Sequence, residues 1–214
     1  MVALGHADGM VTGVTRSFDV SLEEVMRAID PSPAGRVIGM SVVLAKGHTL
    51  FVADTNITEL PTGDELVEIA IEAANAVKTL GVTPRLAFLS YSTFGNPTLG
   101  SRAEKVRLAV KTLDAMGVDF EYEGEMPPEL ALQPELRGNF PFMRLTGPAN
   151  VLIMPAIHSA SIATKLVQAL GEATVIGPLL LGLSKPVQIA PLSASVSTIL
   201  NMATFAAYAA EVQP

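Results

Sequence analysis

The sequence contains no cysteine and no tryptophan among its 214 residues, and aromatic residues make up only 5% of it. Without cysteine, disulfides, thiolate nucleophiles and cysteine-ligated metal sites are excluded. Its three histidines, His6, His48 and His158, do not have the spacing of metal ligands. The absence of cysteine fits a cytoplasmic protein, and the scarcity of aromatic side chains leaves few platforms on which nucleic-acid bases could stack.

Charged residues are also scarce, at 16% of the chain, and they give a net charge of −7. An acidic chain argues against nucleic acid as a partner, although local basic groups can still bind a phosphorylated small molecule. No apolar run approaches the roughly 18 residues of a transmembrane helix, and no segment is typical of a secretory signal peptide. We therefore expect a cytoplasmic protein with neither a nucleic-acid nor a membrane partner.

Hydrophobic residues make up 49% of the chain, enough for one large domain or two small ones. Apolar runs of strand length alternate with segments of helical periodicity, which predicts an α/β fold. Strands are expected at residues 10–13, 36–45, 49–53, 85–90, 119–122, 150–154, 174–183 and 187–190. Helices are expected after capping boxes at Ser21, Thr62 and Ser101, over residues 161–170, and after Ser195 or Ser197. Residues 31–35 (PSPAG) are typical of a linker and mark a candidate domain boundary.

Residues 147–186 form the most informative unit: a buried strand, a hydroxyl-rich loop, a helix and a second apolar run. This order predicts a parallel strand pair with a right-handed crossover. In such sheets ligands bind beyond the carboxyl ends of the strands. Here that position is the loop at residues 156–161, which ends at a helix N-terminus that favours anions.

A second candidate anion site is the loop at residues 90–101, which is rich in serine, threonine and glycine and precedes a capped helix. That helix carries the densest basic stretch of the chain, namely Arg102, Lys105, Arg107 and Lys111. One interpretation is a phosphate- or pyrophosphate-binding loop. The other is that Ser101 only caps the helix and the basic side chains are solvated. The loop matches neither the P-loop nor the dinucleotide-binding fingerprint.

Three further patterns have a functional and a structural interpretation. His158 and Ser159 invite a hydrolase interpretation, but no nucleophile elbow is present, which favours a hydrogen-bonded structural histidine. The alternating carboxylates of residues 119–125 are more typical of a solvated strand face than of a metal site. Arg16, after the first predicted strand, is either an anion contact or an ordinary surface arginine.

Five motifs resemble the phosphate acetyltransferase family in their order along the chain: DGMVTG (8–13), LSYSTFG (89–95), the Gly-Glu of EYEGE (121–125), GPANVLIMP (147–155) and IGPLLLGLSKP (176–186). The resemblance covers most of the chain. The stretches VTGVTRSF, FVADT and FEYEGEM are similar to the phosphotransacetylase-like C-terminal region of large bacterial NADP-dependent malic enzymes. This resemblance implies a three-layer α/β/α fold with a mostly parallel sheet, in the two-domain architecture shared with isocitrate and isopropylmalate dehydrogenases.

That architecture implies an active-site cleft between two domains and a homo-oligomer, at least a dimer, joined through the second domain. We expect residues 1–33 and 179–214 to belong to an incomplete first domain, and residues 34–178 to form the second. Acetyl-CoA is the small-molecule partner that the resemblance implies. The residues expected to bind acetyl-CoA or phosphate are Thr12, Arg16, Ser90, Ser92, Thr93, Ser101, Arg102, Ser159, Ser161 and Lys165.

The sequence departs from the family where the enzymes carry their reacting groups. These are a serine–arginine pair soon after the Lys-Pro motif, an aspartate thought to act as base at the last helix, and an arginine after an early Asp-Thr-Leu run. The corresponding positions here hold Pro191, Leu192, Thr198 and Glu23. After Lys185 no charged residue follows until the end of the last predicted helix. Loss of a general base typically costs ~10²–10⁴-fold in rate, so we expect no catalytic residues and no acetyl transfer.

Three functions stay open. The first is a catalytically silent regulatory domain that binds acetyl-CoA, in a malic enzyme whose N-terminal part carries NADP, a divalent metal and the oxidative decarboxylation of malate. The second is a working phosphate acetyltransferase in which Arg16 or Arg144 replaces the missing arginine. The third is a structural oligomerisation module with a vestigial cleft. None of the three requires a cofactor or a metal within this chain.

Overall fold

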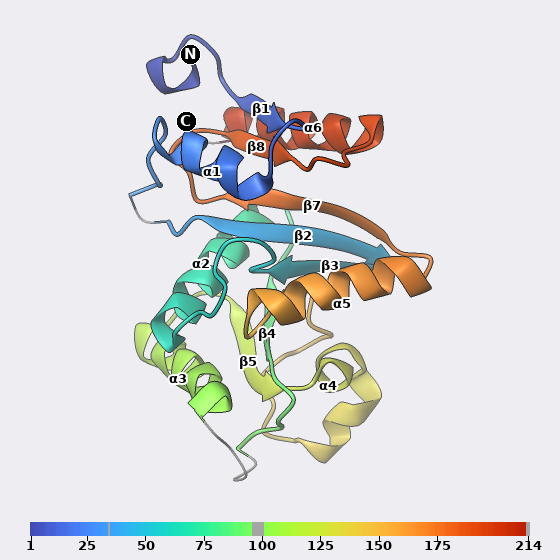
Figure 1. Ribbon diagram of the computed structural model, residues 1–214. Coiled ribbons are helices and arrows are strands. Elements are labelled where there is room, and N and C mark those ends of the chain that lie inside the picture. The colour runs from blue at the N-terminus through green and yellow to red at the C-terminus, as the bar shows by residue number, and fades with distance from the viewer. Residues whose placement is uncertain (34, 96–100, 213–214) are drawn as a thin grey trace.

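The computed structural model of the chain describes residues 1–33, 35–95 and 101–212, and the side chains of residues 101 and 102 lie outside the described part. The strands form a two-stranded sheet and a six-stranded sheet. In the small sheet, β1 (Met10–Gly13) pairs in parallel with β8 (Val187–Ala190). Figure 1 shows this small sheet at the top, above the strands of the large one.

The large sheet runs in the order β5-β4-β6-β3-β2-β7. Its strands are β2 (Ile38–Ala45), β3 (His48–Ala53), β4 (Arg85–Leu89), β5 (Glu121–Met126), β6 (Val151–Ile153) and β7 (Thr174–Leu181). Strands β3 to β6 pair in parallel, whereas β2 is antiparallel to both of its neighbours. The carboxyl ends of β3, β4 and β6 therefore meet at one edge, the edge at which ligands bind in such sheets.

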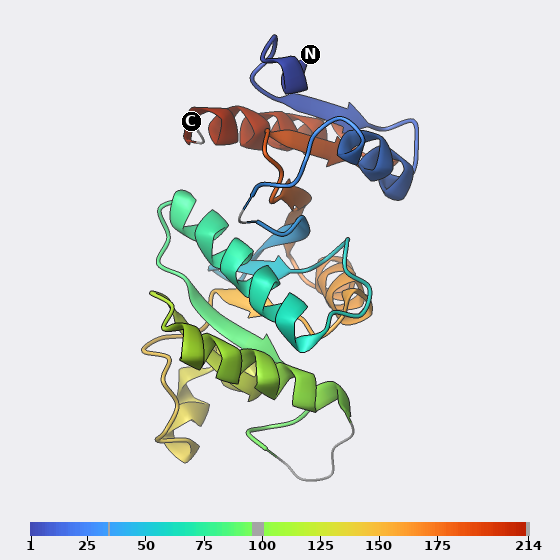
Figure 2. The ribbon, with the colours of Figure 1, turned by 90° about the vertical axis from the view of Figure 1, so that its left-hand side faces the viewer.

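Helices cover both faces of the large sheet. Helices α2 (Gly63–Thr79) and α3 (Ser101–Met116) lie on one face, and α4 (Pro128–Leu132) and α5 (Ile157–Leu170) on the other (Figures 1 and 2). Side chains of the central strands alternate between the two cores. Ile153 packs in the core beneath α2 and α3, while its neighbour Leu152 packs in the core beneath α4 and α5. The predicted three-layer α/β/α fold with a mostly parallel sheet is confirmed.

The small sheet has its own helices. Helix α1 (Phe18–Met26) packs on it through a cluster that includes Val25, Val187 and Ile189. Helix α6 (Val196–Val212) contacts β8 and β1, but its fully buried Met202 belongs to the core of the large sheet. Two 3-10 helices complete the fold, η1 (Val2–Leu4) and η2 (Pro134–Asn139). The predicted division into domains at residues 33/34 and 178/179 stays a prediction.

The two chain segments that join the sheets run side by side. Pro31 and Leu183 form an antiparallel bridge, and the Ser32 N–H donates to the Gly182 carbonyl at 2.8 Å. Gly182 has a φ of 80°, and a Cβ atom there would lie 2.0 Å from the Arg36 carbonyl oxygen. Glycine is therefore required at this crossing, because a side chain would collide with backbone.

The local signals for helix ends are only partly confirmed. The capping box at Thr62 is present, because its Oγ1 accepts from the Glu65 N–H at 3.2 Å and its own N–H donates to Glu65 Oε2 at 2.8 Å. The capping box predicted at Ser21 is wrong: the N-cap is Ser17, and Ser21 is buried inside α1. The N-cap at Ser195 before α6 is confirmed by the Thr198 N–H bond to its Oγ at 3.1 Å. The box predicted at Ser101 lies outside the described side chains.

Two predictions for residues 147–186 are wrong. Strands β6 and β7 are parallel in direction but are not neighbours, since β3 and β2 lie between them. The expected loop at residues 156–161 is largely the first turn of α5, which begins at Ile157. A local apolar pattern predicts that a segment is a strand, but it does not predict which strand lies beside it. Here the β2–β3 hairpin lies between β6 and β7, and the local pattern of those two strands would be the same without it. Among the helices in the described part of the chain, none is long and apolar enough to cross a membrane.

Candidate functional site

A cavity of about 490 Å³ lies at the edge of the large sheet where β4 and β6 end. We call it the strand-end cavity. Its walls come from the loop between β3 and α2, the segment after β4, the start of α3, and the turn between β6 and α5. Its lining residues are Leu60, Ser90, Tyr91, Ala103, Lys105, Pro155, Ala156, His158 and Ser159. Because β4 and β6 are neighbouring parallel strands, segments far apart in the sequence meet here.

Lys105 joins two walls of the strand-end cavity. Its Nζ donates to the Pro61 carbonyl at 2.7 Å and to the Pro155 carbonyl at 3.0 Å. The residue is half-buried, so its ammonium brings positive charge to a partly desolvated surface. Lys105 lies in the basic stretch that the sequence shows, but it is not among the residues predicted to bind acetyl-CoA or phosphate. The sequence does not show that the Pro61 and Pro155 carbonyls lie beside Lys105, because only the folded chain brings them together.

The first turn of α5 forms the opposite wall. Its N-cap is Ala156, which offers no side chain to the first backbone N–H groups. The Ile157 N–H is bonded to the Glu59 carbonyl at 3.2 Å, and the following N–H groups of the turn, together with the helix dipole, favour an anion. Ser159 Oγ donates to the Ala156 carbonyl at 2.7 Å, and His158 Nε2 lies 3.8 Å from Glu59 Oε1. The Ser159 hydroxyl is thus directed to the backbone, which gives no support to a hydrolase.

The loop after β4 is held in place by a buried carboxylate. Glu125, at the end of β5, accepts from Ser92 Oγ, from the Gly95 N–H at 3.1 Å and from Arg107 Nη1 at 3.0 Å. The loop backbone adds a bond from the Phe94 N–H to the Glu125 carbonyl at 3.0 Å. Ser92 is therefore occupied in fixing the loop, and Ser90, the loop residue beside it, lines the cavity.

Only part of the predicted site comes together in the strand-end cavity. Ser90 and Ser159 line it, and Thr93 lies in the loop beside it without being part of its lining. Ser161 and Lys165 lie further along α5 and are likewise absent from the described lining. The predictions for Ser101 and Arg102 lie outside the described side chains. Their role, like that of the other predicted binding residues, stays a prediction.

Thr12 and Arg16 belong to the small sheet and the loop that follows it. Thr12 pairs with Ile189 in the sheet register, and Arg16 forms an exposed ion pair with Glu24. At the neighbouring end of β8, Leu192 is largely exposed, and Thr198 lies in the first turn of α6, where its N–H is bonded by Ser195. The positions at which the family's reacting groups were expected thus hold an apolar side chain and a helix-capping turn.

The interpretation of residues 119–125 as a solvated acidic face holds for Asp119, which is exposed, but is wrong for Glu123 and Glu125. Glu123 and Glu125 are 5% and 0% exposed, and each meets an arginine. Glu123 Oε2 lies 3.2 Å from Arg144 Nε, and the same guanidinium also pairs with Asp114. These partners come from distant segments, so the alternation of carboxylates could not reveal them. Among the described residues, no group of histidines and carboxylates could hold a metal ion.

The Arg144 cluster shifts the pKa values of its members. A hydrogen bond from Tyr122 and then contact with Arg144 lower the pKa of Asp114, because both stabilise the carboxylate. Burial, followed by the bond to Asp114, raises the pKa of Tyr122 to about 12. The cluster fixes the segment after η2 to β5 and lies away from the strand-end cavity lining, so its part is structural.

Comparison with known proteins gives a consistent result. A family profile described as phosphate acetyl/butaryl transferase matches residues 1–207. An NADP-dependent malic enzyme of Rhizobium meliloti (strain 1021) is 58% identical over 208 residues, which are 97% of this chain and 27% of that protein. A phosphate acetyltransferase of Acetivibrio thermocellus is 32% identical over 220 residues, which cover 99% of this chain and 66% of that protein. A solved phosphotransacetylase from Streptococcus pyogenes has a TM-score of 0.91 at 31% identity, covering 98% of this chain and 65% of that one.

Proposed function

Because the chain belongs to the phosphate acetyl/butaryl transferase family, we propose that it is the phosphotransacetylase-like C-terminal regulatory domain of an NADP-dependent malic enzyme. In this role it binds acetyl-CoA as an allosteric effector and does not transfer the acetyl group. The choice of parent protein is supported by the malic enzyme that is 58% identical, of which the chain spans 27%. NADP, a divalent metal and the oxidative decarboxylation of malate to pyruvate would belong to the N-terminal part of such a parent chain.

This proposal is supported by the difference between the strand-end cavity and the segment after β8. A phosphate-bearing ligand in the strand-end cavity would lie near the positive charge of Lys105, whose ammonium also holds the Pro61 and Pro155 carbonyls, and near His158 and the N-terminus of α5. The segment after β8 offers Pro191 and Leu192, with no charged side chain before Glu211. Transfer of the acetyl group from acetyl phosphate to CoA needs a base that takes the proton of the CoA thiol and an electrostatic clamp for the anion, and in the reverse direction the same group returns the proton to the leaving thiolate. A site that keeps the anion contacts but lacks those groups is suited to binding without reaction.

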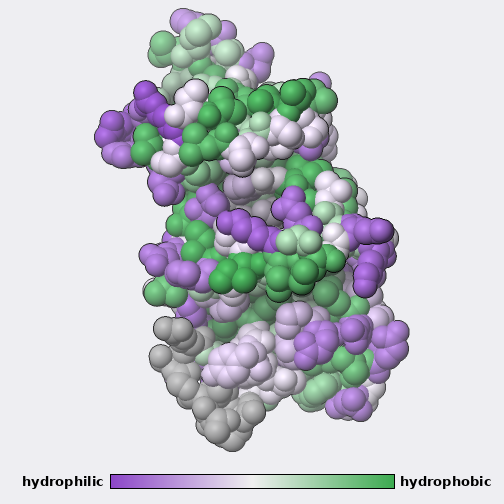
Figure 3. Space-filling model, turned by 45° about the vertical axis from the view of Figure 1, so that its right-hand side comes forward, coloured by the Kyte–Doolittle hydropathy of each residue, from purple (hydrophilic) through white to green (hydrophobic). Residues whose placement is uncertain are grey.

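We also propose that residues 34–178 form the second of two domains and mediate a homo-oligomer. The support is an apolar stripe on α5, where Ile162, Leu166 and Leu170 are 65%, 54% and 81% exposed. We call this the α5 stripe. In Figure 3 a hydrophobic band crosses the middle of the visible face, over α5. Contiguous exposed apolar side chains of this kind mark interaction surfaces more often than free surface.

Calorimetric titration with acetyl-CoA tests the binding role. We expect saturable binding to the wild-type chain and affinity reduced by about ten-fold for Lys105→Ala, since a charge-assisted contact contributes about 1.5 kcal/mol or more. Lys111→Ala, an exposed lysine on the same helix, is the matched control and should bind as the wild type does. Absence of acetyl-CoA binding to the wild type, in this chain and in a longer one with upstream residues, would leave the structural oligomerisation module as the function.

The second candidate is an active phosphate acetyltransferase, which the 32% identity to the Acetivibrio thermocellus enzyme favours. It is separated from the first by an assay of acetyl-CoA formation from acetyl phosphate and CoA. The regulatory proposal expects no rate above the reaction without protein. A rate above that background would reject the silent domain. In a complete malic enzyme, Lys105→Ala should also diminish the response of malate decarboxylation to acetyl-CoA.

A further inference from the structure

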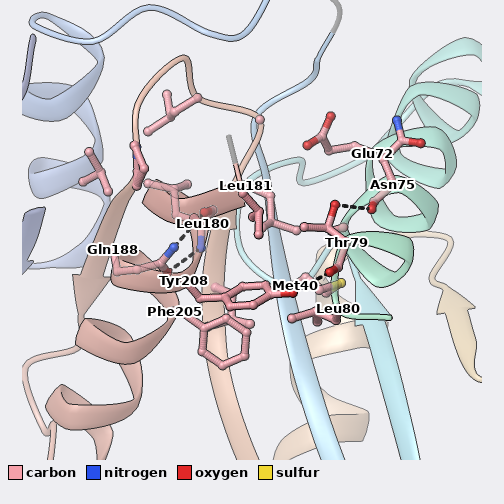
Figure 4. A pocket seen from close by; sticks show the side chains of 18 of the residues that line it. Met40, Glu72, Asn75, Thr79, Leu80, Leu180, Leu181, Gln188, Phe205 and Tyr208 are labelled. Carbon is pink, nitrogen blue, oxygen red and sulfur yellow. Dashed lines mark hydrogen bonds between the residues drawn. The ribbon is translucent and has the colours of Figure 1, made fainter. Parts of the chain in front are cut away.

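A second cavity, of about 130 Å³, lies where α2 meets α6. We call it the hinge cavity, because its lining includes Gly182, Leu183, Lys185 and Pro186 of the connection between β7 and β8. It also takes in the C-terminal half of α2, from Glu72 to Leu80, and the last turns of α6, from Phe205 to Val212. It shares no lining residue with the strand-end cavity. Figure 4 shows Glu72 and Asn75 at one end and the rings of Phe205 and Tyr208 at the other.

Most polar groups around the hinge cavity are already satisfied within the protein. The Gln188 amide exchanges two hydrogen bonds with the Leu180 backbone, at 2.9 and 3.0 Å. Tyr208 donates its hydroxyl to the Thr79 carbonyl at 2.6 Å, and Thr79 Oγ1 donates to the Asn75 carbonyl at 3.0 Å. The Tyr208 bond joins α6 to α2, the Gln188 bonds join β8 to β7, and all of them leave the corresponding polar groups unavailable to a ligand.

Glu72 differs from these groups. Among the described residues, its carboxylate makes no hydrogen bond and no ion pair, although it is half-buried. The preceding turns of α2 show the contrast, because Glu65 and Glu68 both pair with Arg36 at 2.7 Å. Lys185 is the other charged residue of the lining, and it is exposed and forms no ion pair with Glu72. Burial without a cation raises the pKa of Glu72.

The remaining lining of the hinge cavity is apolar. Its aliphatic and aromatic side chains include Met40, Leu80, Leu179, Leu181 and Phe205. An apolar cavity of about 150 Å³ is large enough for benzene, so this one holds a body of roughly six non-hydrogen atoms. An uncompensated carboxylate beside an apolar cavity of this size is complementary to a small cation that carries a compact hydrocarbon body.

We propose that the hinge cavity is a binding site for a small organic amine, with the ammonium paired to Glu72 and the hydrocarbon body between α2 and α6. The ligand would contact elements of both sheets on either side of the connection at residues 182–186. The site is independent of acetyl-CoA binding at the strand-end cavity. Because only the carboxylate form of Glu72 attracts the ammonium, affinity should rise with pH through the raised pKa of Glu72 and then level off.

The experiment uses isobutylammonium chloride as the probe and isobutanol as its neutral counterpart, titrated into the intact chain and followed by NMR chemical shifts. We expect saturable shifts with isobutylammonium and affinity weaker by about ten-fold for Glu72→Gln, the loss of one favourable charge contact. Glu129→Gln, which removes an exposed carboxylate on α4, is the matched control and should bind as the wild type does. Ala76→Leu, which fills the cavity from α2 and keeps Glu72, should weaken binding as well.

Equal binding of isobutylammonium and isobutanol would overturn the proposal, as would unchanged affinity for Glu72→Gln. Absence of saturable binding to the wild type would overturn it too. A circular-dichroism melt of each variant shows whether it is folded. If Ala76→Leu does not fold, the comparison of Glu72→Gln with Glu129→Gln and the pH series still decide the question. Acetyl-CoA titration of the same samples keeps failure at this site distinct from failure at the strand-end cavity.

Discussion

At the scale of single residues, buried carboxylates determine how the loop after β4 is held. Glu125 is fully buried, and it accepts bonds from Ser92, Gly95 and Arg107 at once. Its second oxygen, Oε2, has no hydrogen-bond partner within the described part of the chain. Its neighbour in the same strand, Glu123, is bound by Arg144 instead. Two carboxylates on one strand therefore anchor two different segments.

Glu125→Gln should lower the free energy of unfolding by about 2 kcal/mol, because the neutral amide loses the ion pair with Arg107 at a fully buried position. Chemical unfolding in urea measures this loss. Glu129→Gln is the control and should stay within about 0.5 kcal/mol of the wild type, since its side chain is exposed. A stability equal to that of the wild type for Glu125→Gln would contradict its assignment as the loop anchor.

The pKa shift of Asp114 in the Arg144 cluster predicts a dependence of stability on pH. The folded state lowers the pKa of Asp114 below its ordinary value near 3.8, so its contribution is present above that value and is lost as the pH falls through the folded pKa. Asp114→Asn should therefore be less stable than the wild type at neutral pH, by less than about 1 kcal/mol because the pair is half exposed. The difference in urea midpoint should shrink between about pH 5 and pH 3. A difference that stays constant over that range would show that the charge of Asp114 has no part in it.

At the scale of elements, hydrogen bonds at the N-caps determine where some helices begin, and packing determines where the helices lie. The sequence predicts the capping box of α2, because Thr62 and Glu65 have the required spacing. The start of α5 was not readable, because its N-cap is Ala156 and carries no capping side chain. A side-chain cap gives a signal that the sequence can show, although the predicted cap of α1 is misplaced, since its N-cap is Ser17 and not Ser21. A helix start fixed by tertiary contacts gives no such signal.

Thr62→Ala should reduce the free energy of unfolding by about 1 kcal/mol, since it removes the oxygen that accepts from the Glu65 N–H. Thr204→Ala is a suitable control, because Thr204 lies within α6 and its exposed hydroxyl bonds only to the preceding turn. Alanine is the better helix former there, so no loss is expected. Equal losses in the two variants would mean that the capping bonds of α2 contribute nothing specific.

At the scale of the whole molecule, exposed apolar helix faces indicate where other chains or segments pack. The α5 stripe lies on the large sheet, while α6 carries a second exposed group near the small sheet that includes Leu200. The two surfaces belong to different helices and can be tested separately. The proposed homo-oligomer uses the α5 stripe.

Leu166→Glu should convert the proposed oligomer to monomers, because a carboxylate at the centre of an apolar interface is desolvated without a partner. Size-exclusion chromatography with light scattering measures the mass. Leu200→Glu is the matched control, since it places the same charge on an exposed leucine of α6, and its mass should equal that of the wild type. A change of mass in Leu200→Glu alone would move the interface to α6.

The sequence by itself determined the α/β class, the family and the lack of charge between Lys185 and Glu211, because these depend on periodicity, motif order and composition. The tertiary structure alone decided that β3 and β2 separate β6 from β7, and that Lys105 meets the carbonyls of Pro61 and Pro155. Among the described residues it also left Glu72 without a cation, while Arg36 pairs with Glu65 and Glu68, the two preceding carboxylates on α2. The physical reason is that strand order sets which distant residues meet, and a local pattern of polar and apolar residues carries no information on that order.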